Sequence, residues 1–227
     1  MLKNVLVSAA TLMMFTCTAQ ASDSADLKIS ALLETGACTP SLSDGGEAHF
    51  GNIPLSNLNA TSTNQLGSRF LTLTINCLET TSVGWSITDN KKDSVQQLEI
   101  KNPKFNGENL SDVNYQYGLG KTAGNVKIGA YAIYTDLNNV TADGVKAKVM
   151  YISTNGSKFG SGAGEIINNS GYINTVEVWG ATAGTPLSAK NFIWPLKITA
   201  AIQDTNTLNI SDDTPLDGSS TISIVYL

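Results

Sequence analysis

Histidine and cysteine are scarce in this chain of 227 residues, which contains one histidine, His49, and three cysteines. The Ser–His–Asp arrangements of hydrolases and the Cys/His sets of structural zinc sites depend on these two residue types. The sequence also has no Gly-x-Ser-x-Gly segment, which marks the nucleophile of many esterases. We therefore expect a protein that is not an enzyme and that holds no metal ion and no cofactor.

Positive charge is also limited, because 14 Lys and Arg residues face 19 Asp and Glu residues, for a formal net charge of −5. No run of basic residues is present. Nucleic acids and anionic membrane surfaces attract proteins mainly through clustered Lys and Arg. The composition therefore argues against both as partners, and no segment after residue 21 is apolar enough to predict membrane insertion.

The first 21 residues have the pattern of a secretory signal peptide. Lys3 precedes an apolar run, Val5–Phe15, and Ala19–Ala21 places small residues at the expected cleavage positions. We predict cleavage before Ser22 and export of the mature chain. A lipoprotein signal ending at Cys17 is the alternative, but the three residues before Cys17 fit that processing site poorly.

Cleavage at this point leaves two cysteines, Cys38 and Cys77, which lie 39 positions apart (77 − 38). An even pair in an exported chain indicates a disulfide bond. Closing a loop of this length stabilises a fold by about 4 kcal/mol in the chain-entropy model.

Apolar residues seldom recur at helical spacing, whereas alternation with a period of two is frequent, which is the pattern of half-buried strands. Turn residues such as Asp143–Gly144 and Asp217–Gly218 separate the alternating segments. Many short strands joined by polar turns favour a single-domain, all-β sandwich. The predicted strands cover 70–75, 83–87, 126–134, 147–152, 175–179, 192–202 and 221–227.

Both ends of the mature chain alternate as well. Near the amino end, every second residue from Leu27 is apolar, namely Leu27, Ile29, Ala31 and Leu33. At the carboxyl end the alternation continues to the last residue, through Ile222, Ile224, Tyr226 and Leu227. Strands that reach so close to both termini are unusual, because the ends of most domains are poorly ordered.

Taken in order, these features resemble the subunits of chaperone–usher fimbriae. An alternating segment precedes the first cysteine, which lies in Gly36–Leu42, and the strand Phe70–Ile75 leads to the second cysteine. Tyr226 is the penultimate residue and follows apolar residues at two and four positions before it. The resemblance covers nearly the whole mature chain, although its motifs lie mainly at the two ends.

The resemblance implies an immunoglobulin-like β-sandwich that lacks its last strand, with residues 22–34 as a donor-strand extension and residues 35–227 as the sandwich domain. A periplasmic chaperone first fills the open groove, and at an outer-membrane usher the extension of a neighbouring subunit replaces it by strand addition. In this scheme Leu27, Ile29, Ala31 and Leu33 are donated. Ile222, Ile224, Tyr226 and Leu227 form the acceptor groove and chaperone contact. The implied protein passes through the periplasm to the cell surface and contributes to adhesion as part of a fimbria.

A second hypothesis is a complete secreted β-sandwich that binds carbohydrate or a host surface. In that case Leu27–Leu33 is an ordinary first strand and the carboxyl-terminal segment an ordinary last strand. Trp85, Trp179 and Trp194 are candidates for stacking on sugars, although tryptophans on alternating strands more often belong to a core.

Overall fold

The computed structural model describes residues 37–153, 159–161, 164, 166, 171–177, 184–210 and 212–227. These residues belong to one compact unit, Thr35–Leu227. The predicted signal peptide, 1–21, and the predicted donor extension, 22–34 with Leu27, Ile29, Ala31 and Leu33, lie outside the described residues.

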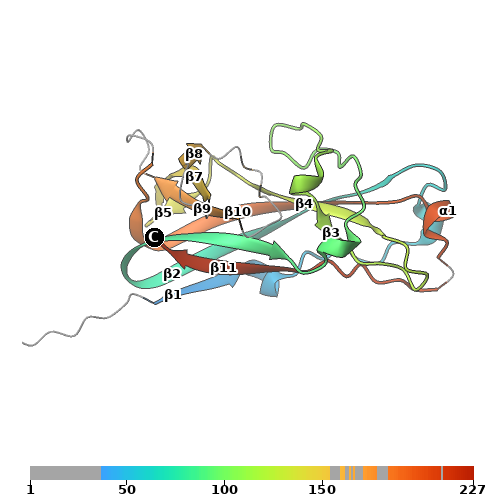
Figure 1. The fold of residues 1–227 in the computed structure, drawn as a ribbon, viewed down its shortest axis with the longest axis horizontal. Helices are drawn as coiled ribbons and strands as arrows, with labels where there is room; N and C mark the ends of the chain where they lie inside the picture. The colour runs from blue at the N-terminus through green and yellow to red at the C-terminus, as the bar shows by residue number, and fades with distance from the viewer. Residues whose placement is uncertain are drawn as a thin grey trace, which may run out of the picture. The chain divides into compact units, whose positions relative to one another are not determined.

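The described part of the chain is built almost entirely from antiparallel strands, which confirms the all-β prediction (Figure 1). Its one α-helix is a single turn, α1 (Thr205–Leu208), and short 3₁₀ turns join some strands. The strands are β1 (Cys38–Leu42), β2 (Asn64–Asp89), β3 (Tyr117–Gly118), β4 (Gly129–Thr135), β5 (Thr141–Ala142), β6 (Val145–Lys146), β7 (Lys148–Ser153), β8 (Phe159–Ser161), β9 (Tyr172–Glu177), β10 (Ser188–Ile202) and β11 (Ser220–Tyr226).

Strand β2 takes part in both layers of the fold. Its residues 64–82 pair with β10, which in turn pairs with β4, and we call this layer sheet A. Its residues 83–89 pair with β11, and Trp85 pairs with β9, in the layer we call sheet B. Between the two parts the strand turns back at its left end in Figure 1, where residues 78–80 are exposed. The single strand β2 is thus the pairing partner of β1 in sheet A and of β11 in sheet B.

The main core lies between the two sheets. Trp85 of sheet B meets Trp194 of sheet A edge to face, with ring centroids 5.5 Å apart, and both side chains are buried. The alternation seen in the sequence explains this, because every second residue of a strand faces the same side. Leu73 and Ile75 on β2 and Phe192 on β10 fill the same layer. Neither Trp85 nor Trp194 is therefore available for stacking on a sugar, and Trp179 lies outside the described residues.

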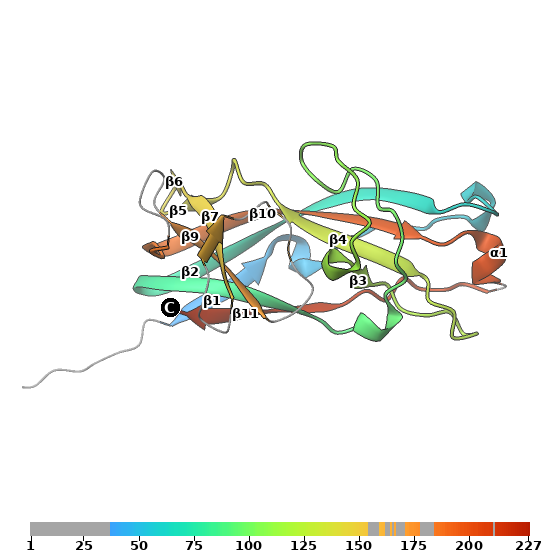
Figure 2. The same ribbon diagram turned by 45° about the horizontal axis from the view of Figure 1, so that its top comes forward.

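A second, smaller core lies on the outer face of sheet A. The sequence predicted that residues 126–134 form a strand with one apolar face, but β4 is buried on both faces. Tyr131 and Ile133 point to the main core, whereas Ala130, Ala132 and Tyr134 join an outer cluster. The outer cluster forms because the segment 95–116 passes beside β4 (Figure 2) and contributes its buried side chains, Ile100 and Leu110.

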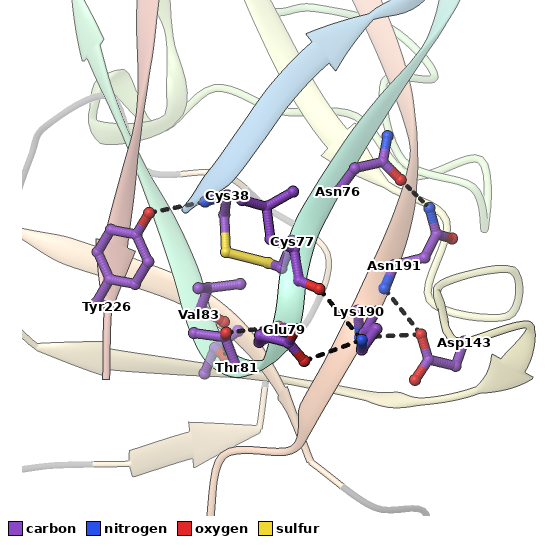
Figure 3. The surroundings of a disulfide bond; sticks show 12 residues. Cys38, Asn76, Cys77, Glu79, Thr81, Val83, Asp143, Lys190, Asn191 and Tyr226 are labelled. Atoms are coloured by element: carbon purple, nitrogen blue, oxygen red, sulfur yellow. Dashed lines mark hydrogen bonds and ion pairs between the residues drawn. A yellow bond between two sulfur atoms is a disulfide. The ribbon is translucent and has the colours of Figure 1, made fainter. Parts of the chain in front are cut away.

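The predicted disulfide bond between Cys38 and Cys77 is present and joins the first residue of β1 to its pairing partner in β2. The nearby bend of β2 is held by Lys190, whose ammonium group donates to the Leu78 carbonyl at 3.1 Å and pairs with Glu79 at 3.0 Å (Figure 3). The disulfide and these bonds fix the start of β1 against the bend.

The sequence also predicted a hairpin at Asp143–Gly144, and the structure confirms it. This pair joins β5 to β6, and both residues have positive φ angles, 47° for Asp143 and 77° for Gly144. Asp143 also holds β10, because its carboxylate accepts the backbone N–H groups of Lys190 and Asn191 at 3.0 and 2.8 Å.

Removing the disulfide tests its contribution to the fold. Replacing Cys38 and Cys77 together by Ser is expected to lower the free energy of unfolding by about 4 kcal/mol, because the unfolded chain regains the freedom of the closed loop. Urea unfolding followed by tryptophan fluorescence measures the difference. A reducing agent should destabilise the wild-type chain and leave the double variant unchanged, and equal effects on both would contradict the assignment.

Candidate functional site

Two strand edges face each other on one side of the sandwich. Within the described residues, β1 pairs with β2 alone and β11 pairs with β2 alone, so each has one edge without a strand partner. Figures 1 and 2 both show β1 and β11 next to one another. Because β2 reverses direction between the segments to which they pair, β1 and β11 run in opposite directions. A strand inserted between them would be antiparallel to one and parallel to the other.

An apolar cavity of about 280 Å³ lies between these two edges. Leu42 lines it from the end of β1, together with Phe50 from the segment that follows. Ile222 lines it from β11, and its deeper wall consists of side chains of the main core. The core is therefore accessible from outside at this place, where an additional strand would cover it. The deeper wall includes Leu71, Ile87, Leu119, Ile133, Leu196 and Ile198.

The predicted acceptor residues on β11 occupy different positions along this groove. Ile222 lines the cavity, and Ile224 is half-buried against the main core. Thr221 and Ser223, which alternate with them, are exposed, as the period of two requires. Tyr226 and Leu227 are 54% and 44% exposed, so they lie at the surface where a partner protein can reach them.

The groove narrows toward Tyr226. The Cys38 backbone N–H donates to the Tyr226 hydroxyl at 2.9 Å, which joins the start of β1 to the end of β11 (Figure 3). At the other end of the groove lie Leu42, four residues after Cys38, and Ile222, four residues before Tyr226, and these two side chains line the open cavity. The groove is thus closed by a side chain at one end and open at the other, an arrangement that the sequence did not reveal.

Gly218, Tyr131 and Ser220 line the open end, and Asp89, which pairs with Ser220 across the ladder, lies beside it. The Tyr131 and Ser220 hydroxyl groups are 2.7 Å apart, and burial raises the pKa of Tyr131, so this phenol is neutral at physiological pH. Burial also raises the pKa of Asp89, although its carboxylate accepts the backbone N–H groups of Gly118 and Lys91 at 2.9 and 2.8 Å, which acts in the opposite direction.

Sequence reasoning predicted a turn at Asp217–Gly218, whereas the structure packs Gly218 against the wall of the cavity. A Cβ atom at this position would lie 3.0 Å from Tyr131 Cε1 and 3.2 Å from Leu119 Cδ2. The missing side chain therefore keeps the end of the groove open. No local pattern indicated this role, since it depends on strands that are distant in the sequence.

The groove offers hydrophobic contacts and unpaired strand edges rather than reactive groups. Among the residues that the structure describes, no group of three or more His, Cys, Asp and Glu side chains is placed to hold a metal ion. In the same residues, no helix combines the length and apolar character needed to cross a membrane. What the arrangement can do physically is accept one more strand, through backbone pairing and the insertion of alternate side chains.

Comparison with known proteins gives three similarities. A family model described as a protein of unknown function, DUF1120, matches residues 27–132. The uncharacterized protein YhcF of Escherichia coli K12 is 31% identical over 236 residues, which cover 94% of each chain. Protein GltF of the same bacterium is 27% identical over 232 residues, which cover 92% of this chain and 91% of GltF.

Substitution of Gly218 tests the tight packing at the open end. Gly218→Ala is expected to lower the free energy of unfolding by about 1–3 kcal/mol, because the added methyl group must displace Tyr131 or Leu119. Gly124→Ala is the matched control, because a Cβ atom at position 124 would lie 3.6 Å from its nearest neighbour, Thr122 Oγ1. We expect this substitution to change the free energy of unfolding by no more than about 0.5 kcal/mol. If urea unfolding shows equal effects of the two substitutions, position 218 accommodates a methyl group and the tight packing described here is contradicted.

Proposed function

This chain belongs to the same family as YhcF, and on that premise we propose that it is a structural subunit of a bacterial surface fimbria, assembled by donor-strand exchange. The observation that carries the proposal is the apolar cavity between the unpaired edges of β1 and β11. An exposed strand edge beside an open core promotes aggregation unless another strand covers it. The proposed occupant is the amino-terminal segment of a neighbouring subunit.

The chemistry of the groove agrees with the alternation of that segment. Leu27, Ile29 and Leu33 recur at every second position and would all point toward the cavity side of an added strand, with the smaller Ala31 between the last two. Burying the three large side chains contributes roughly 5–9 kcal/mol as an upper figure. The match to the family model begins at Leu27, which supports treating this segment as part of the shared architecture.

Assembly of this kind needs other proteins before the neighbouring subunit arrives. We expect a periplasmic chaperone to occupy the groove first and to hold the exposed Tyr226 and the carboxylate of Leu227. An outer-membrane usher would then bring two subunits together for the exchange. Since the donor segment and the groove are different surfaces of one subunit type, such contacts need not close into a ring and can be repeated to build a filament.

The proposal is tested with the full mature chain, starting at Ser22, and a synthetic peptide of residues 22–34. Ile29→Asp in the chain removes its ability to donate a strand, so light scattering should show a monomer where the wild-type chain forms oligomers. The labelled wild-type peptide should bind this monomer in fluorescence anisotropy. The same peptide carrying Ile29→Asp should bind roughly 100-fold more weakly, because an unpaired charge is buried.

Matched controls use the alternation of each strand. Ser30→Asp in the peptide adds the same charge on the opposite face and should leave binding nearly unchanged. On the acceptor, Ile222→Asp should abolish peptide binding, whereas Thr221→Asp, at an exposed neighbour, should retain it. A wild-type chain that stays monomeric and does not bind the peptide would overturn the proposal and favour a complete secreted sandwich.

A further inference from the structure

A second cavity, of about 400 Å³, lies on the side of sheet A opposite the groove. Its walls are residues 104–106 and Glu108, near the middle of the segment that covers β4, and residues 134–138, where β4 ends. Tyr131 and Ile133 line the groove, while the adjacent Tyr134 lines this second cavity, and adjacent residues of a strand face opposite sides. The second cavity is therefore separate from the surface that strand addition would use.

An aromatic ring and several polar groups converge on this cavity. Phe105 is 46% exposed, and its position is held by Phe70, with ring centroids 6.5 Å apart, and by the Lys197 ammonium group, 5.5 Å from the ring centre. Asn106 and Asn138 lie in the same lining. Their Oδ1 atoms accept hydrogen bonds from the Glu108 backbone N–H and the Lys146 ammonium group at 3.1 and 3.3 Å, so each amide has its NH2 group to offer as a donor. A half-exposed ring beside planar amide groups suits a ligand with one apolar face and several hydroxyl groups.

The charges in the lining point to a neutral ligand. Lys104 and Glu108 form an ion pair at 3.0 Å, so these two charges offset each other. Both carboxylate oxygens of Asp136 already accept hydrogen bonds, from the Asn138 backbone N–H and the Asn139 amide. The Lys197 ammonium group beside Phe105 donates to the backbone carbonyls of Asn102 and Lys104 at 2.6 and 3.3 Å, so the two cations near the ring already have partners. Among the described residues, no cluster of carboxylates is placed to hold a metal ion.

From this juxtaposition of Phe105 with the amides of Asn106 and Asn138, we propose that the second cavity binds a neutral saccharide. The C–H face of the sugar ring packs on Phe105, while its hydroxyl groups accept hydrogen bonds from the two amide NH2 groups and donate to the Glu108 carboxylate. A cavity of this volume is within the range of small-molecule sites. The site is independent of strand addition and is available on every copy of the chain.

The test is saturation-transfer NMR on the full mature chain with glucose, galactose, mannose and N-acetylglucosamine, and with N-acetylneuraminic acid as an anionic comparison. We expect saturable binding of at least one neutral sugar and a loss of affinity of about tenfold in Phe105→Ala. Asn138→Ala should weaken binding several-fold. Leu55→Ala is the control, because the Leu55 side chain lies outside the cavity and is 44% exposed, close to the value for Phe105. This substitution should leave the affinity for the sugar unchanged.

The outcomes separate this inference from the proposed function. Ile222→Asp, which blocks the groove, should leave sugar binding unchanged. Peptide binding to the groove and sugar binding to the second cavity are therefore tested independently, and one can be disproved without the other. The inference is overturned if no neutral sugar binds saturably, if the anionic sugar alone binds, or if Phe105→Ala binds as well as Leu55→Ala does.

Discussion

The bend of β2 is the constraint from which the groove follows. Since this strand passes from sheet A to sheet B, its two parts offer pairing edges to β1 and to β11 on the same side of the sandwich. The edges of these two outer strands therefore face each other, although Cys38 of β1 and Tyr226 of β11 lie 188 positions apart in the sequence. The contact between Trp85 and Trp194 keeps the layers together behind them.

Local patterns predicted much of this fold because each depends on neighbours in the sequence. Alternation identified segments of β2, β4, β7, β9, β10 and β11, although 70–75 and 83–87 proved to be parts of one strand. The pair Asp143–Gly144 identified a hairpin, and the even pair of cysteines outside the predicted signal peptide indicated the bond between Cys38 and Cys77. The groove could be predicted only in part. Ile222 was identified from its own strand, whereas the contributions of Phe50 and Gly218 depend on contacts between distant segments. The burial of β4 on both faces was missed for the same reason.

Strand β4 separates two environments with different chemistry. Its inward side chains, Tyr131 and Ile133, belong to an apolar groove suited to a strand, and its outer side is covered by residues 95–116. A simple two-layer sandwich does not need this covering segment. Its presence creates a cavity beside Phe105 and Asn138, so the proposed strand addition and the proposed ligand binding use opposite sides of one sheet.

The covalent link at the start of β1 has a mechanical consequence. Tension applied through the chain that precedes Cys38 enters the domain at the first residue of β1 and passes at once through the sulfur atoms to Cys77. Force therefore reaches β2, which pairs with strands of both sheets, and does not peel the short β1 ladder one hydrogen bond at a time. In a domain loaded in this way, the hydrogen bonds of the central strand β2 resist the applied force, rather than those of the edge strand β1 alone.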